Sequence, residues 1–163
     1  MKRRYKAEQN KQSLVYLDET GFETSTERLY AWGLPGKRLF DYRNGNNRKR
    51  TSLLGGYLNK KLIAPLLFEG CCNTAVFNAW LEKELLPCVP PGTILVLDNA
   101  AFHKSKSTQL LVEKAGCHLL FLPPYSPHLN PIEKLWANLK HAWRNASHLS
   151  LDQLISSSEY LWS

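Results

Sequence analysis

The stretch ILVLDNAAFHKS, residues 94–105, sets the interpretation of the whole chain. Four aliphatic residues, Ile94 to Leu97, predict a buried strand, and the apolar run ends abruptly at Asp98 and Asn99. Open sheets with helices on both faces hold ligands just beyond the carboxyl ends of their strands, so Asp98 is a candidate catalytic carboxylate. The alternative is that Asp98 and Asn99 only begin a turn, which both residue types favour.

Length and composition predict one domain with its own core. The chain has 163 residues, 44% of them hydrophobic, which is too few for two domains of ordinary size. Residues 1–13 are basic and polar, and we expect a tail or the remnant of a linker there. The single domain is predicted over residues 14–163.

Several features predict a protein of the cytosol. No apolar stretch follows the charged N-terminus and no segment is long enough to span a bilayer, so neither a signal peptide nor a membrane anchor is expected. The four cysteines show no paired CxxC spacing, which argues against a zinc module and fits a reducing compartment. A metal site at Cys117 and His118 is a weaker alternative.

The net charge of +7 is concentrated in two stretches. Residues 1–12 contain five basic residues and one acidic residue, and residues 37–50 contain six basic residues and one acidic residue. Clustered Lys and Arg gain affinity for polyanions by releasing condensed counterions, so this pattern predicts a nucleic-acid partner. A basic surface that meets only solvent is the alternative.

The order of the predicted elements indicates an α/β fold. LVYLD, residues 14–18, alternates like a strand, and the pattern puts Leu14, Tyr16 and Asp18 on one face. Short strand candidates at 29–32 and 38–42 follow in a loop-rich region. The later predicted elements are a hairpin over 51–68, a helix from Asn73 to Pro87, a helix over 104–115 closed by Gly116, a strand over 118–124, and helices after Asn130 and Ser150. This order is typical of a ribonuclease H-like mixed sheet flanked by helices, with the first and fourth strands side by side.

Three carboxylates can converge at one edge of such a sheet. Asp18 ends the first strand, Asp98 ends the fourth, and Glu133 lies in the first turn of a helix that the preceding loop can bring back over the sheet. Hard oxygen ligands without His or Cys select Mg²⁺ or Mn²⁺. Two such ions can activate an attacking water or hydroxyl and stabilise the leaving oxygen of a phosphodiester.

Each candidate residue also has a simpler interpretation. Asn130 and Glu133 have the spacing of a capping box, in which the carboxylate only returns to the cap amide. Asp18 competes with Glu19, because adjacent strand residues face opposite sides, and we favour Asp18 because it shares a face with the apolar residues before it. His103, near the start of the next helix, could orient a phosphate or a carboxylate that binds the metal. The simpler interpretation is a polar residue near a helix end.

Three segments resemble one family, the catalytic domain of mariner-superfamily transposases, and in particular its bacterial insertion-sequence branch with a DDE-type endonuclease domain. The matching strings are VYLDETGF, LVLDNAAFHKS and LPPYSPHLNPIEKLWANLK. The 34 residues between Asp98 and Glu133 are the separation that this superfamily commonly shows. YAWGLPGKR also matches, and the resemblance extends more weakly over residues 13–145.

The resemblance implies a metal-dependent reaction on DNA. On the family pattern, Asp18, Asp98 and Glu133 are the catalytic and metal-binding residues of a site that uses Mg²⁺, or Mn²⁺ as a substitute, with two ions expected. The implied reaction is phosphodiester cleavage at transposon ends, followed by attack of the freed 3′-hydroxyl on target DNA. The implied partner is double-stranded DNA, in the bacterial cytoplasm at the nucleoid. Because two ends are paired, a full-length enzyme would act as at least a homodimer.

The resemblance also suggests further contacts. Asn99 and His103 match the family's Asp-Asn and His pattern, and Lys140 lies two turns beyond Glu133 on nearly the same helix face. We treat these three residues as candidate contacts with phosphate or with a ligand carboxylate. The predicted contacts with the DNA backbone are Lys37, Arg38, Arg43, Arg48, Lys49 and Arg50.

The N-terminus departs from the family pattern. Such transposases carry N-terminal helix-turn-helix modules that recognise transposon ends, and residues 1–13 are too short to form one. We therefore expect a downstream reading frame, a decayed remnant or an isolated catalytic domain. Two rival hypotheses stay open: a catalytically idle remnant that binds DNA non-specifically, and another ribonuclease H-like nuclease with an unrelated substrate.

Overall fold

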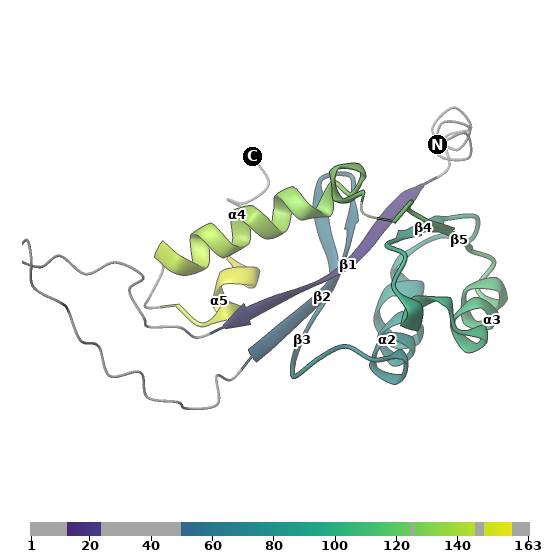
Figure 1. Cartoon of the computed structure of the whole chain (residues 1–163), viewed down its shortest axis with the longest axis horizontal. Helices are drawn as coiled ribbons and strands as arrows, with labels where there is room; N and C mark the ends of the chain where they lie inside the picture. Colours follow the sequence, from purple (N-terminus) through teal and green to yellow (C-terminus); the bar gives the residue numbers. More distant parts are fainter. Residues whose placement is uncertain (1–12, 24–49, 125, 146–148, 158–163) are drawn as a thin grey trace, which may run out of the picture.

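A five-stranded mixed sheet forms the centre of the molecule (Figure 1). The computed structural model describes residues 13–23, 50–124, 126–145 and 149–157. The strands lie in the order β3-β2-β1-β4-β5; β1 to β3 are antiparallel neighbours, and β4 and β5 run parallel to β1. Their bounds are β1 (Leu14–Glu23), β2 (Arg50–Leu58), β3 (Lys61–Glu69), β4 (Ile94–Leu97) and β5 (His118–Phe121). The predicted mixed sheet, with its first and fourth strands side by side, is confirmed.

Helices cover both faces of this sheet. Figure 1 shows α4 and α5 on one side and α2 and α3 on the other. The helical segments are α2 (Thr74–Trp80), which continues as a π-helical turn η1 (Leu81–Leu85) and a 3-10 turn η2 (Leu86–Cys88), then η3 (Ala101–Lys104), α3 (Lys106–Lys114), η4 (Pro127–Leu129), α4 (Ile132–Asn145) and α5 (Leu151–Ser156). Within the described ranges, none of these helices has the length and apolar character needed to cross a membrane.

The alternation along β1 divides the apolar side chains between two cores. Val15 and Leu17 are fully buried in a core with Phe77 and other residues of the α2 and α3 side. Tyr16 lies between them in the sequence and packs in the other core, with Trp136 and other residues of the α4 and α5 side. Fully burying one such large side chain contributes about 1.5–3 kcal/mol. Because a slip of one residue would exchange the two faces, this burial fixes the register of β1.

The two aspartates lie at the same edge of the sheet because β1 and β4 are parallel neighbours. Tyr16 and Val96 are the last paired residues of these strands. Asp18 and Asp98 each follow two residues later, on adjacent strand paths that run in the same direction. The two acids are therefore brought together as predicted, although Asp18 lies within β1 and not at its end.

The predicted end of the first strand at Asp18 was wrong. β1 continues to Glu23, because β2 pairs with it along this whole stretch and ends the ladder with Glu23 opposite Arg50. The apolar alternation stops at Asp18 but the backbone pairing does not. The strand candidates at 29–32 and 38–42 lie outside the described residues.

Local capping signals predicted some of the helix ends. The side chain of Asn73 caps α2 as expected, and Gly116 follows α3 with a φ of +70°, the left-handed conformation that favours glycine. The helix expected from Lys104 begins two residues later, at Lys106, because the hydroxyl of Ser105 provides the cap.

Candidate active site

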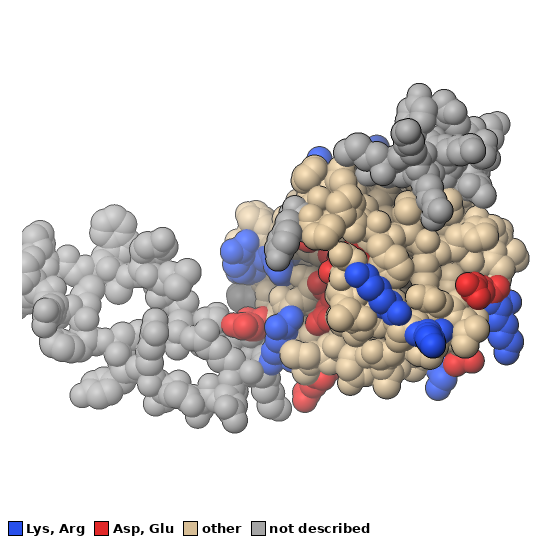
Figure 2. All heavy atoms as spheres, turned by 45° about the vertical axis from the view of Figure 1, so that its right-hand side comes forward, with Lys and Arg blue, Asp and Glu red and all other residues tan. Residues whose placement is uncertain are grey.

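A cleft of about 440 Å³ opens at the edge where β1 and β4 bring their aspartates together. All three predicted acids line it. Figure 2 shows Asp and Glu side chains gathered in a hollow near the middle of the molecule, with Lys and Arg side chains on both sides of it. The residues that line the cleft are Asp18, Asp98, Asn99, Ala100, Leu122, Pro123, Pro124, Ser126, Asn130 and Glu133.

Asp18 is held by two hydrogen bonds that come from different elements. The backbone N–H of Glu19 donates to Oδ1 at 2.8 Å, and the indole Nε1–H of Trp136 on α4 donates to Oδ2 at 3.2 Å. The pKa of Asp18 is raised to about 7, first by burial and next by the negative charge of Glu133. Asp18 is therefore only partly ionised at neutral pH, and a cation in the cleft would favour its charged form.

Asp98 follows the last residue of β4 and has a half-exposed carboxylate. The Nδ1–H of His103 donates to its Oδ1 at 2.7 Å, and the backbone N–H of Ala100 donates to the same oxygen at 3.1 Å. The pKa of Asp98 is lowered, mainly by the hydrogen bond from His103. At neutral pH Asp98 is thus anionic, whereas Asp18 is close to its titration midpoint.

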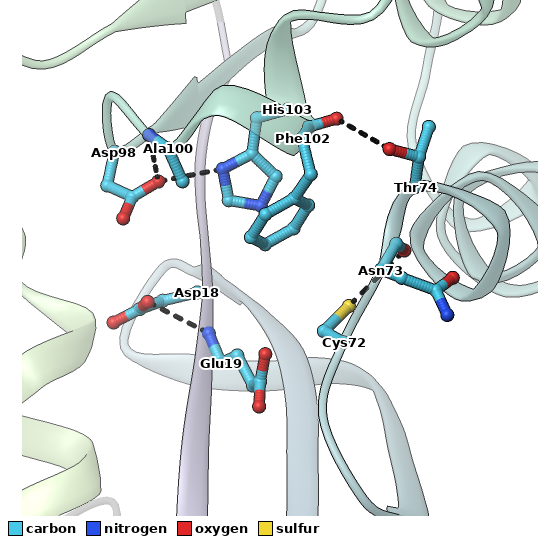
Figure 3. Close-up of polar contacts among 9 residues, drawn as sticks. All are labelled: Asp18, Glu19, Cys72, Asn73, Thr74, Asp98, Ala100, Phe102 and His103. Carbon is cyan, nitrogen blue, oxygen red and sulfur yellow. Dashed lines mark hydrogen bonds and ion pairs between the residues drawn. The ribbon is translucent and has the colours of Figure 1, made fainter.

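His103 contacts Asp98 from the protein interior (Figure 3). It lies in η3, is 4% exposed, and its ring centroid is 4.5 Å from that of Phe77 and 4.0 Å from that of Phe102. It is not among the residues that line the cleft. Of the two roles considered for His103, this geometry favours holding the carboxylate over contacting a phosphate.

Glu19, the alternative to Asp18, lies on the opposite side of β1 from the Asp18 carboxylate in Figure 3. Its Oε1 accepts a hydrogen bond from the Ser52 hydroxyl at 2.9 Å and lies 3.6 Å from Nη2 of Arg50. Glu19 does not line the cleft, and Arg50, a predicted DNA contact, is engaged with it. The other predicted DNA contacts, Lys37, Arg38, Arg43, Arg48 and Lys49, lie outside the described residues.

Glu133 is exposed in the first turn of α4 and lines the cleft. In a capping box, the Asn130 side chain would accept the backbone N–H of Glu133. That N–H instead donates to the backbone carbonyl of Asn130 at 3.2 Å. Oδ1 of Asn130 is buried and has no hydrogen-bond partner in the part of the chain that the structure describes. The expected cap by the Asn130 side chain is therefore absent at this position.

The remaining candidates divide between the cleft and the surface. Asn99 lines the cleft, whereas Lys140 is exposed on α4 and does not line it. Two residues that contribute to the site were missed from the sequence. Trp136 was not among the candidate site residues, and Asn130 was considered only as a cap. The three-residue spacing from Glu133 to Trp136 was the available signal, because residues at that spacing lie on the same helix face.

The donor set fits a hard divalent cation, although no closed three-ligand site is present. Among the described residues, no group of three or more His, Cys, Asp or Glu side chains is placed to hold a metal ion. Cys117 and His118, the alternative metal site, are therefore not part of such a group. Mg²⁺ is commonly held by one or two carboxylates, with water and phosphate oxygens in its other positions. Asp18 and Asp98 supply two such carboxylates at one cleft, with Glu133 in the same cleft.

Comparison with known families agrees with this arrangement. Residues 13–155 match the family described as DDE superfamily endonuclease. The chain belongs to this family. The match spans all five strands of this DDE superfamily endonuclease and all three acids of the cleft.

Curated relatives are similar to this DDE superfamily endonuclease over part of their length. The insertion element IS630 uncharacterized 39 kDa protein of Shigella sonnei is 29% identical over 146 residues, which cover 87% of this chain and 42% of the relative. The transposable element Tc1 transposase of Caenorhabditis elegans is 29% identical over 87 residues, which cover 53% of this chain and 32% of the relative. The chain spans between about a third and a half of the length of the curated relatives it matches.

The fold is similar to that of a solved transposase structure. The mariner Mos1 paired end complex with Mg superposes with a TM-score of 0.71 at 21% identity, covering 98% of this chain and 52% of that chain. This likeness confirms the predicted ribonuclease H-like fold of the DDE superfamily endonuclease.

Proposed function

We propose that this DDE superfamily endonuclease is the catalytic domain of a transposase. It would cleave phosphodiester bonds at transposon ends and join the freed 3′-hydroxyl to target DNA. The proposal rests on one observation above all: Asp18, within β1, and Asp98, directly after the parallel strand β4, line a single cleft, which Glu133 also lines. The family match and the relatives that are named as transposon proteins support it.

Asp18, Asp98 and Glu133 are the residues that would hold a divalent cation. The Mos1 complex that shares this fold contains Mg, which supports Mg²⁺ here, with Mn²⁺ as a substitute and two ions as the expected number. When bound, the cation lowers the pKa of the attacking hydroxyl group and offsets the charge on the leaving oxygen. No covalent intermediate with the protein is required.

The other residues of the site would position these acids. His103 keeps Asp98 anionic and fixes the direction of its carboxylate through the 2.7 Å hydrogen bond. Trp136 fixes the carboxylate of Asp18 from α4. Without a cation, the negative charges of the cleft repel a DNA phosphate, so DNA and cation should enter the site together.

Double-stranded DNA is the proposed partner. The basic residues between 37 and 50 would contact its backbone, which gives affinity but little sequence discrimination. A full-length enzyme that pairs two transposon ends would act as at least a homodimer.

Nicking of supercoiled plasmid tests the proposed function. We expect the purified chain to nick in Mg²⁺ and in Mn²⁺, and EDTA to abolish nicking. Asp98→Asn should lower the rate at least about a hundredfold, because it removes a charged ligand. Glu113→Gln provides the matched control, since this acid is exposed on α3 away from the cleft, and it should nick like the wild type.

The same assay separates the rival hypotheses. Nicking that persists in EDTA or in Asp98→Asn would contradict the metal site. Absence of nicking together with DNA binding of steep salt dependence would favour the idle remnant. Cleavage of an RNA–DNA hybrid in preference to DNA would favour a different ribonuclease H-like nuclease. Strand transfer is followed separately, by joining of a labelled oligonucleotide with a free 3′-hydroxyl to the plasmid.

A further inference from the structure

Asn130 lines the cleft and has a buried polar atom without a hydrogen-bond partner among the described residues. The residue is 6% exposed, it lines the cleft together with Asp18, Asp98 and Glu133, and its Oδ1 has no hydrogen-bond partner among the described residues. Leaving a buried acceptor unpaired costs about 1–3 kcal/mol. A side chain that only supported the fold would be expected to have a partner, so this atom points to a ligand.

The role of Asn130 in the fold does not explain its side chain. The backbone carbonyl of Asn130 accepts the N–H of Glu133, and this bond needs no particular side chain at position 130. The helix start therefore leaves the carboxamide free to contact a ligand. As an uncharged group beside three acids, it can contact a ligand without adding to their mutual repulsion.

The chemistry of the cleft limits what can bind to Oδ1. An amide oxygen can bind a hard cation, and as a hydrogen-bond acceptor it needs a ligand that presents an O–H or N–H group. The ionised acids in the cleft are acceptors too, and the oxygens of a phosphodiester carry no proton. In the proposed reaction, the donors that reach the cleft are the attacking groups themselves: water in the cleavage step and a DNA 3′-hydroxyl in the joining step.

We propose that Oδ1 of Asn130 accepts a hydrogen bond from the attacking hydroxyl group and thereby orients it toward the phosphorus. This inference rests on the proposed function. In cleavage, the water oxygen forms the new P–O bond, the bond from phosphorus to the 3′-oxygen breaks, and the products are a 3′-hydroxyl and a 5′-phosphate. In joining, the 3′-oxygen forms the P–O bond and the target strand leaves with a 3′-hydroxyl. The amide is not a base, so in both steps the attacking group loses its proton to solvent water, and the leaving 3′-oxygen takes up a proton from solvent water.

The test compares Asn130→Leu, Asn130→Asp and the wild type in single-turnover nicking at several DNA concentrations. Leu has a similar size and lacks the acceptor, and we expect its maximal rate to fall about 10- to 100-fold, the effect of a misplaced reactant. The DNA concentration at half-maximal rate should change less than about threefold, since the contact is with the nucleophile. Asp keeps an acceptor at this position and should retain more activity than Leu.

Strand transfer should fall with Leu by the same factor as nicking. Asn138→Leu is the matched control, because it makes the same change at an exposed position of α4.

Thermal unfolding distinguishes this role from a structural one. Because Oδ1 has no partner among the described residues, Asn130→Leu should unfold at the same temperature as the wild type or higher. A large loss of thermal stability would show that the amide supports the fold and would overturn the proposal. Full activity of Asn130→Leu, a loss that appears only in DNA affinity, or a loss that a higher Mg²⁺ concentration restores would also overturn it, while wild-type nicking keeps the proposed function intact. A wild type that does not nick would overturn both.

Discussion

Replacing Asp18 with Asn should stabilise the metal-free domain at pH 8.5 but not at pH 5.5. The pKa of Asp18 is raised from 3.8 to about 7 in the folded protein. One pKa unit corresponds to about 1.4 kcal/mol, so ionising this buried carboxyl in the fold costs about 4 kcal/mol. Because the folded state binds the proton more tightly than the unfolded state, the stabilising effect is complete below about pH 4 and is lost as the pH rises through about 7.

The Asn side chain removes the charge but has one oxygen where Asp18 has two. The N–H groups of Glu19 and Trp136 each donate to a different oxygen of Asp18, so one of these hydrogen bonds is lost in the variant, at a cost of about 1–2 kcal/mol. The variant should therefore be more stable than the wild type by about 2 kcal/mol at pH 8.5. For a domain of this size, this corresponds to a rise in Tm of about 4–8 °C. At pH 5.5 Asp18 is protonated in the folded state but ionised in the unfolded state, which costs the wild type about 2 kcal/mol. This cost roughly offsets the hydrogen bond that the variant loses, so the difference should be within about 1 kcal/mol of zero.

Urea unfolding in EDTA at both pH values measures this difference. Glu113→Gln on α3 is the control for removing one surface charge, and its effect should be small at both pH values. Millimolar Mg²⁺ should restore the advantage of the wild type at pH 8.5, because the cation binds the ionised carboxylate. A variant less stable than the wild type at pH 8.5 in EDTA, or an effect of equal size at both pH values, would refute the reasoning.

Three further substitutions test single contacts. His103→Phe should abolish most nicking, because the hydrogen bond to Asp98 is lost, and retained nicking would contradict this. The free energy of unfolding should stay within about 1.5 kcal/mol of the wild type, because an aromatic ring stays packed at this position. Trp136→Phe should weaken Mg²⁺ binding about tenfold, since the N–H that orients Asp18 is removed. The affinity is measured from the rise of the unfolding temperature with Mg²⁺ concentration, and an unchanged affinity would contradict this prediction. Gly56→Ala should lower the free energy of unfolding, measured with urea, by about 1–3 kcal/mol, because the added Cβ would lie 3.0–3.1 Å from three packed side chains. A substitution without effect would show that these neighbours move apart freely.

The parts of the site that follow from local pattern could be predicted from the sequence. The apolar run before Asp98 and the alternation before Asp18 place both acids on predicted strands, and the order of the elements makes those strands neighbours. The choice of Asp18 over Glu19 also follows from the alternation, since only one of them can face the α4 side.

The parts that depend on distant residues could not be predicted. β1 extends past Asp18 because β2 pairs with it, and nothing in the composition of the strand itself shows where that pairing stops. His103 faces the interior because Phe77, from a different helix, packs against its ring. The orientation of the Asn130 side chain depends on the backbone geometry of the turn before α4, which the capping-box spacing does not determine.

The two aspartates are attached to different hydrophobic cores. His103, which bonds Asp98, packs on Phe77 of the core beside α2 and α3, whereas Trp136, which bonds Asp18, belongs to the core beside α4 and α5. A partly folded form with only one core packed would retain one aligned carboxylate and lose the other. Tight cation binding would then require the whole domain to be assembled, so the metal affinity of a variant reports the integrity of both layers at once.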